Sequence, residues 1–121
     1  MKLHAISRIL TGSLMAIAMA IPMIALSPAS DARAQEVNHT LTIRDGKFEP
    51  STLQVKAGVK FKLTITNTSA KSAEFESSEL NREKVVPAGG SGSIYIGPLE
   101  PGTYPFFDDF NQSNRGRIVA K

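Results

Sequence analysis

Six carboxylates gather in two short stretches of the second half of the chain, and these residues are the best suited to do chemistry. They are Glu74, Glu76, Glu79, Glu83, Asp108 and Asp109. Side chains alternate between the two faces of a strand, so we expect Glu74 and Glu76 to share a face, and Asp108 to share one with Tyr104 and Phe106. A buried carboxylate is costly without a partner, and a metal ion would be one. Oxygen-only ligands suit iron, manganese, calcium or magnesium rather than Cu(I).

The same acids also have an ordinary structural interpretation. Acid pairs in β-proteins usually lie on solvated edges, and Asp109 could accept hydrogen bonds from backbone N–H groups in a turn. The side chains of Lys84, Arg115 or Arg117 could form ion pairs with the acids. The sequence leaves both interpretations open, although Glu79 is better explained as a solvated residue.

The composition excludes several kinds of site. The chain has no cysteine, and residues 35–121 contain no methionine and a single histidine, His39. Disulfides, thiolate zinc sites and thiol catalysis are therefore excluded. A blue-copper centre is excluded too, because it requires a thiolate and two imidazoles. The serine-rich stretch 69–78 has no histidine or aspartate arranged to activate a nucleophile, so we expect neither a hydrolase nor a transferase.

The first 34 residues have the pattern of an export signal. Lys2 and Arg8 precede an apolar stretch over residues 9–26, and Ala32-Arg33-Ala34 has the small-x-small pattern of a cleavage site. We therefore predict a signal peptide over residues 1–34. The alternative is an uncleaved membrane anchor, for which the apolar stretch is marginal in length.

Cleavage before Gln35 would leave one small domain, residues 35–121, in the periplasm. Three of the fourteen basic residues precede Gln35, so the charge of the domain is nearly balanced. Nucleic-acid binding calls for basic side chains clustered on one face, and no such cluster is present in the sequence.

Short alternating segments separated by Gly and Pro turns run through this domain. The clearest strand is 60–67, in which Phe61, Leu63 and Ile65 lie on one face. Further strands are expected over residues 40–44, 53–56, 74–76, 84–86, 93–96, 103–108 and 116–120. Asp109 to Arg115 is expected to be a loop. This spacing predicts an all-β fold, an antiparallel β-sandwich of seven or eight strands.

Several short motifs of the second half occur in a characteristic order. They are Ile65-Thr66-Asn67, Pro87-Ala88-Gly89, Pro101-Gly102-Thr103-Tyr104, Phe106-Phe107-Asp108 and Gly116-Arg117-Ile118-Val119. In this order they resemble the cupredoxin family, in which a strand ending in Asn precedes the first ligand loop and a Pro-Gly-x-Tyr turn precedes the second. The resemblance implies a Greek-key β-sandwich that covers nearly all of residues 35–121.

The resemblance also implies which residues stand at the family's copper-ligand positions. Glu74 stands where the first histidine would be, Asp108 where the cysteine thiolate would be, and Asn111 where the second histidine would be. No methionine follows to serve as an axial ligand. Oxygen donors have thus replaced the imidazoles and the thiolate, which implies a harder ion than copper in its usual site.

A narrower resemblance is to the EfeO-type cupredoxin-like proteins of bacterial ferrous-iron uptake. It rests on Glu74-Phe75-Glu76, on Glu83 and on the segment Tyr104 to Asp108. It implies a periplasmic metal-binding accessory protein that works beside an iron permease and assists the oxidation or delivery of ferrous iron. The implied metal ligands are Glu74, Glu76, Glu83, Asp108 and Asp109.

Iron, as Fe2+ or Fe3+, is the metal that the resemblance implies first, and Cu2+ is the second choice, without a type 1 copper centre. The alternative function is a metal-free cupredoxin-like scaffold that docks a membrane or periplasmic partner. The loss of all the usual copper ligands is what such a scaffold would show.

Overall fold

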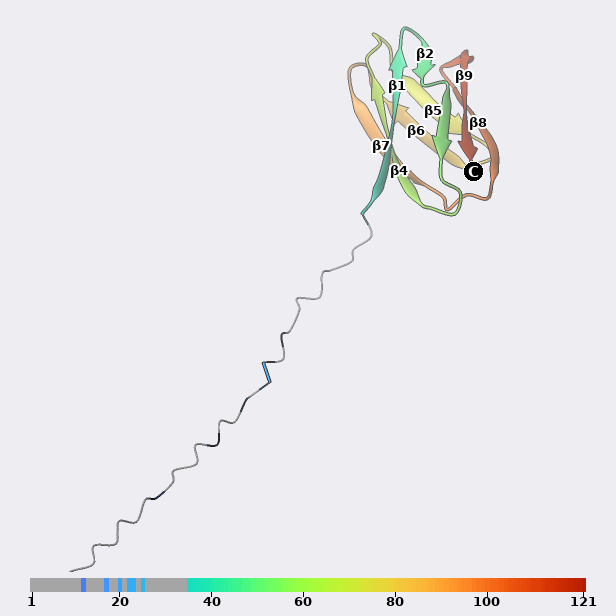
Figure 1. Cartoon of the computed structure of the whole chain (residues 1–121). Helices are drawn as coiled ribbons and strands as arrows, with labels where there is room; N and C mark the ends of the chain where they lie inside the picture. The colour runs from blue at the N-terminus through green and yellow to red at the C-terminus, as the bar shows by residue number, and fades with distance from the viewer. Residues whose placement is uncertain (1–11, 13–16, 18–19, 21, 24, 26–34) are drawn as a thin grey trace, which may run out of the picture. The chain divides into compact units, whose positions relative to one another are not determined.

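A computed structural model of the chain describes residues 35–121 together with the isolated positions 12, 17, 20, 22, 23 and 25. Residues 35–121 form the folded domain (Figure 1). The predicted signal peptide and its cleavage site lie almost wholly outside the described residues. Within the described part of the chain, no helix is long and apolar enough to cross a membrane.

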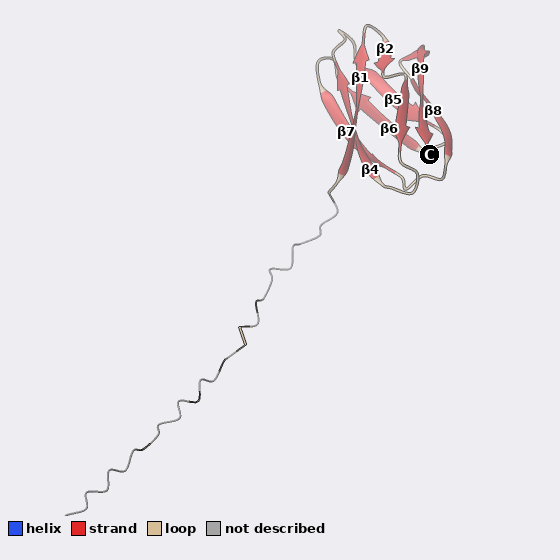
Figure 2. Ribbon diagram, in the orientation of Figure 1, coloured by secondary structure: helices blue, strands red, loops and turns tan. Residues whose placement is uncertain are grey.

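The described residues form strands and turns without a helix (Figure 2). The nine strands are β1 (Val37–Arg44), β2 (Lys47–Glu49), β3 (Thr52–Val55), β4 (Phe61–Asn67), β5 (Ala73–Ser77), β6 (Arg82–Val86), β7 (Ser91–Ile96), β8 (Gly102–Asp108) and β9 (Asn111–Ala120). The predicted all-β class is confirmed. The strand beyond the expected eight is β2, a short segment that pairs with β1 after the turn at Asp45 and Gly46.

Two sheets face each other to form a sandwich, with strand orders β2-β1-β4-β7 and β3-β9-β8-β5-β6. Figure 1 shows β1, β4 and β7 in one layer and β5 and β6 in the other. The pairs β1–β4 and β3–β9 are parallel, and the remaining pairs are antiparallel. The expectation of a purely antiparallel sandwich therefore differs at two pairs. In both cases the chain crosses to the other sheet before returning, so a parallel pairing needs no tight hairpin.

The core lies between the two sheets, and the alternation of β4 shows how it forms. Phe61, Leu63 and Ile65 are buried, whereas the residues between them are only partly covered. Across the core, the Phe106 ring packs against Phe48 and Phe75, at centroid distances of 4.9 and 5.0 Å. Aromatic pairs in such geometry stabilise a fold by about 0.5–1.5 kcal/mol beyond their burial. The trio joins β2 of one sheet to β5 and β8 of the other.

The predicted loop from Asp109 to Arg115 is wrong, because β9 already begins at Asn111. Only Asp109 and Phe110 separate β8 from β9, and the register shifts between Phe107 and Asp108. The first residues of β9 are polar and exposed, so their sequence lacks the apolar alternation that marks a strand. Pairing with β8 supplies the hydrogen bonds that make this segment extended.

Gly116 of β9 provides a test of the packing behind β8. A Cβ atom there would overlap with Cζ of Phe106 and would lie 2.8 Å from the Ser51 carbonyl oxygen. We expect Gly116→Ala to lower the free energy of unfolding by about 1–3 kcal/mol, the usual cost of overpacking a core. Urea denaturation measures this change.

The matched control is Gly92→Ala in β7. Its added Cβ would meet the Cε atom of Lys84 at 2.8 Å, and this side chain is flexible enough to move. The control should stay within about 0.5 kcal/mol of wild type, as surface substitutions usually do. Equal effects of the two substitutions would contradict the packing described for Gly116.

Candidate metal centre

Strand β5 carries two of the predicted metal ligands on its outer face. Ala73, Phe75 and Ser77 of β5 are buried, whereas Glu74 and Glu76 between them are half-buried and face away from the core. The register confirms this arrangement, because Glu76 lies opposite Phe107 of β8, which is not a core residue. Facing partners on paired strands share a face of the sheet. The prediction that Glu74 and Glu76 share a face is confirmed.

Asp109 joins these two glutamates from the turn after β8. Its backbone N–H donates to the Glu74 carbonyl oxygen at 2.9 Å, which holds the turn beside the start of β5. One carboxylate oxygen from each of Glu74, Glu76 and Asp109 lies within 4.8 Å of the other two. These three acids are called the outer acidic cluster below. A hard cation lies about 2.0–2.6 Å from each of its oxygen ligands, and small shifts of the side chains would place the three oxygens at such distances from one ion.

Glu83 is a fourth acid close to the cluster. It lies directly opposite Glu76 in the pairing of β5 with β6, and it is exposed. Its oxygens are not among the three that converge, but its charge adds to theirs. Glu79 lies in the exposed turn between β5 and β6 and is not part of the cluster, in agreement with its interpretation as a solvated residue.

The pKa of Glu74 is raised above the ordinary value for glutamate. Partial burial of the carboxyl group is the largest cause, followed by the negative charges of Asp109, Glu83 and Glu76, with Asp108 contributing least. Each neighbouring carboxylate makes ionisation of Glu74 less favourable. A bound cation would reverse this effect.

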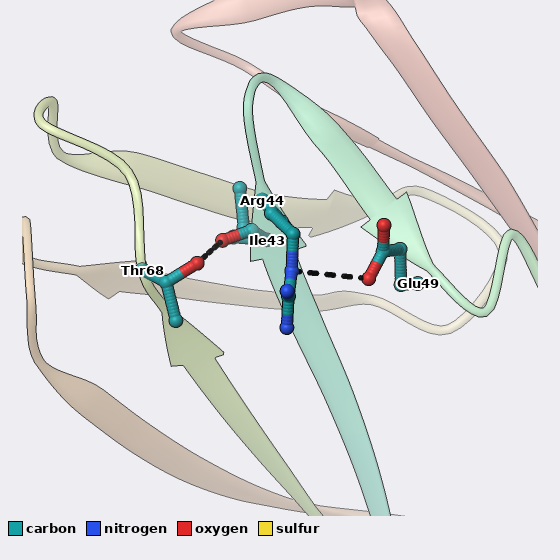
Figure 3. Close-up of polar contacts among 4 residues, drawn as sticks. All are labelled: Ile43, Arg44, Glu49 and Thr68. Carbon is teal, nitrogen blue, oxygen red and sulfur yellow. Dashed lines mark hydrogen bonds and ion pairs between the residues drawn. The ribbon is translucent and has the colours of Figure 1, made fainter.

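Ion pairs do not neutralise the cluster within residues 35–121. The ion pair found there joins Arg44 Nε to Glu49 Oε2 at 3.3 Å, and it lies on β1 and β2 (Figure 3). Arg115, an expected partner of the acids, instead lies over the ring of Phe107 at 5.4 Å from its centroid. The interpretation of the acids as members of ordinary ion pairs therefore finds no support among the described residues.

Asp108 faces the opposite side of the sheet from the outer acidic cluster. It lies opposite Phe75 in the register, faces the core side of the sheet and is 4% exposed. Its Oδ1 atom accepts hydrogen bonds from the backbone N–H groups of Glu74, at 2.9 Å, and Phe110, at 3.0 Å. Glu74 and Asp108 thus point to opposite faces of the sheet, and the structure does not bring them together as ligands of one ion.

A cleft of about 520 Å³ opens beside Asp108 at this end of the sandwich. Its wall includes Ala73, Asp108, Phe110 and Asn111, together with the turn at Asp45 and the loop of residues 68–72. Sequence reasoning missed the turn and the loop as parts of a site. The polar, serine-containing loop after a strand ending in Asn was the available signal.

Asn67 shapes the loop that forms one wall of the cleft. Its side chain is fully buried, and Nδ2 donates to the carbonyl oxygens of Lys71, at 2.8 Å, and Val86, at 3.1 Å. Its Oδ1 accepts from the backbone N–H of Ser69 at 3.0 Å. Thr68 Oγ1 donates to the Ile43 carbonyl oxygen at 3.1 Å, which fastens the same loop to β1 (Figure 3).

The residues around the cleft do not fit a type 1 copper ion. Such an ion needs a thiolate and two imidazoles, whereas Ala73, Asp108 and Asn111 supply a methyl group, a carboxylate and an amide. His39 packs edge-on against Phe61 at 5.1 Å between ring centroids, near the beginning of β1. It lies six residues before Asp45, roughly 20 Å along an extended chain. His39 is therefore too far away to complete a copper site at the cleft.

Comparison with known proteins agrees with this architecture. Residues 14–120 match the family described as the cupredoxin-like domain, and the chain belongs to that family. An uncharacterised protein of Rickettsia prowazekii is 43% identical over 81 residues, which cover 66% of this chain and 65% of that protein. The matched segment thus spans slightly less than two thirds of that relative.

Solved structures show the same fold at low sequence identity. The metal-binding domain of the Cu(I)-exporting P-type ATPase CopA of Streptococcus pneumoniae, determined with Cu(I), is 15% identical, with a TM-score of 0.60 over 69% of this chain and 84% of that one. A purple cupredoxin of Nitrosopumilus maritimus is 16% identical, with a TM-score of 0.55 over 68% of this chain and 98% of that one. Amicyanin of Paracoccus versutus is 16% identical, with a TM-score of 0.55 over 75% of this chain and 86% of that one.

The raised pKa of Glu74 predicts how stability depends on pH. The folded state holds the Glu74 proton more tightly than the unfolded chain does, so this stabilisation is complete below the ordinary glutamate pKa and is lost as the pH rises through the raised value. Glu74→Gln removes the repulsion. In the metal-free protein it should raise the thermal midpoint at neutral pH but not at about pH 3, where the Glu74 carboxyl group is protonated.

Glu79→Gln is the control, because Glu79 is not among the charges that raise the pKa of Glu74. Thermal unfolding of the three proteins in the presence of a chelator, at both pH values, measures the effect. A Glu74→Gln midpoint that is no higher than wild type at neutral pH would show that the cluster is not under electrostatic strain.

Proposed function

We propose that this protein is a periplasmic metal-binding accessory of iron uptake, in which the outer acidic cluster holds the metal. The observation that supports this function best is the convergence of Glu74, Glu76 and Asp109 within 4.8 Å. The cluster lies on a sheet of a cupredoxin-like fold, at the end where the family resemblance leads us to expect a metal. Asp108 and Glu83, predicted as ligands from the sequence, are neighbours of the cluster in this proposal rather than members of it.

The donor atoms favour iron over copper as the physiological metal. All three residues offer carboxylate oxygens, which suit Fe2+, Fe3+ or Mn2+ and are poor ligands for Cu(I). The similar structures of CopA and amicyanin are copper proteins by description, but their identity with this chain is too low to transfer a metal. Cu2+ remains the second candidate, because it too accepts oxygen ligands.

The exposure of the cluster suits a protein that passes its metal on. Asp109 is exposed and the two glutamates are half-buried, so an ion bound there would keep water ligands and could exchange with a partner. Three negative charges also stabilise Fe3+ more than Fe2+, because the attraction grows with the charge of the ion. Binding would therefore favour oxidation of ferrous iron when an electron acceptor is present, and delivery to an iron permease would follow.

Calorimetric titration of the purified domain with Mn2+, Cu2+ and, without oxygen, Fe2+ tests the site. We expect saturable binding that Glu74→Gln and Asp109→Asn each weaken by about tenfold or more, because each removes one of three charged donors. Glu79→Gln removes the same charge from the next exposed turn and should leave the affinity unchanged. Binding that is absent, or equally strong in all four proteins, would refute the proposal.

A second function, a metal-free scaffold, has one observation in its favour. Val85 lies opposite Glu74 in the register and is 51% exposed, and Phe107 lies opposite Glu76. The outer face therefore mixes apolar and acidic side chains, as docking surfaces often do. On this alternative the acids would contact a partner directly and would need no metal.

Capture of membrane partners separates the two functions. Tagged domain is incubated with a detergent extract of the membranes of the source cells, with and without a chelator, and the bound fraction is analysed for protein and for metal. The metal-binding proposal predicts that capture of an iron permease depends on metal. A partner that is retained under chelation, on a domain without metal, would favour the scaffold.

A further inference from the structure

The cleft beside Asp108 is separate from the outer acidic cluster and has a chemistry of its own. Asp108 and Ala73 face it from the inner side of the β5–β8 pair, whereas Glu74 and Glu76 lie on the outer side. At about 520 Å³ the cleft is in the range of small-molecule sites, roughly 300–1,000 Å³. The proposed metal site makes no use of it.

Asp108 brings a buried charge to this cleft. The residue is 4% exposed, and both hydrogen bonds to its carboxylate, from the backbone N–H groups of Glu74 and Phe110, end on Oδ1. Among residues 35–121, Oδ2 receives no hydrogen bond and no ion pair. Oδ2 is not among the buried side-chain atoms without a partner, so it is accessible from the cleft and can accept a hydrogen bond from a ligand there.

Two hydroxyl groups on the loop wall, those of Thr68 and Ser69, present acceptors rather than donors. Thr68 Oγ1 donates its proton to the Ile43 carbonyl oxygen, and Ser69 Oγ is bonded to Asn67 Oδ1 and to the Lys71 carbonyl oxygen. A hydroxyl whose proton is engaged can offer only its lone pairs. Together with Asp108 Oδ2, these two hydroxyl oxygens offer acceptors to a ligand that donates hydrogen bonds.

We propose that the cleft binds a primary alkylammonium group, with Asp108 Oδ2 as its counter-ion. An ammonium has three N–H donors, no acceptor and a compact charge, which fits one free carboxylate oxygen among hydroxyl lone pairs. A guanidinium group prefers both oxygens of a carboxylate, and Oδ1 is already used twice. A metal ion would need several charged ligands, and the acids of the cleft are only Asp108 and Asp45.

Phe110 supplies the apolar contact that such a ligand needs. Its side chain lines the cleft and is 55% exposed, which is unusual for a large aromatic residue. An aromatic ring at the mouth can pack against the alkyl chain and can attract the ammonium through its face. The ligand class is therefore an alkyl amine, either a free amine or diamine or the side chain of a lysine.

Lys71 could compete for the same carboxylate, because it also lines the cleft. It is exposed, and its ammonium makes no ion pair among the described residues. Lys71→Gln should therefore leave amine binding at or above the wild-type affinity. If amines bound only to this variant, the carboxylate would be reserved for Lys71 and the proposal would be wrong.

The test is an NMR titration of the isotope-labelled domain, in chelator, with n-butylamine, putrescine and Nα-acetyl-lysine amide, and with n-butanol as the uncharged control. We expect saturable shifts at the amides of Ala73, Phe110 and Asn111 with the amines and none with n-butanol. Tighter binding of putrescine would identify a free diamine as the ligand, and tighter binding of the lysine derivative would identify a lysine side chain. The absence of shifts with all three amines would overturn the proposal.

Asp108→Asn is the decisive variant. An asparagine keeps an Oδ1 acceptor for the two backbone N–H groups but removes the charge, and we expect it to weaken amine binding by about tenfold or more. Glu79→Gln is the charge-matched control and should change nothing. Unchanged affinity in Asp108→Asn would refute the proposal. If this variant does not fold, Phe110→Ala should weaken binding severalfold, and full retention of affinity there would refute it instead.

The same variants keep the two sites apart. Asp108→Asn should retain the metal binding expected of the outer acidic cluster, and Glu76→Gln should lose metal affinity while it retains amine binding. If Asp108→Asn abolished metal binding and amines did not bind to the wild type, the cleft would be a metal site and not an amine site. Failure of the metal titration alone would leave the amine site standing.

Discussion

One carboxylate oxygen, Oδ1 of Asp108, holds together the end of the sandwich where the acids gather. It accepts the backbone N–H of Glu74 at the start of β5 and that of Phe110 in the turn before β9. Strands β5 and β8 share only two register pairs, and this side chain adds a further link between them. Hydrogen bonds to an ionised acceptor are stronger than neutral ones, and loss of the acceptor would leave two backbone donors without partners.

This link produces two different cation environments from one pair of strands. The alternation of β5 directs Glu74 and Glu76 outward, where the turn brings Asp109 to them, while Ala73 and Asp108 face the cleft. On the outer face, the acids of the cluster repel one another near water, and a bound metal ion would offset this repulsion. On the inner face, the Asp108 carboxylate lies near hydroxyl oxygens, and the proposed alkylammonium group would donate hydrogen bonds to them. The two sites therefore lie on opposite faces of the β5–β8 pair.

The core behind this end keeps both environments in place. Phe48, Phe75 and Phe106 contact one another across the two sheets, and Gly116 leaves room for the Phe106 ring. Asn67, buried at the end of β4, fixes the loop that closes the cleft. A close-packed core resists deformation, so it holds the acids of the outer acidic cluster in place despite their mutual repulsion. Partial burial and the neighbouring charges together raise the pKa of Glu74.

The sequence by itself determined the all-β class, the family and the sharing of a face by Glu74 and Glu76, because these follow from alternation and from short motifs of fixed spacing. It also excluded a blue-copper centre, since no thiolate is available in the chain. Only the tertiary structure decided which acids meet. Whether Asp108 points with Glu74 or away from it depends on the register of β5 against β8, which places Asp108 opposite Phe75. A shift of one residue would have reversed the outcome, and pairing between distant strands leaves no trace in the local pattern.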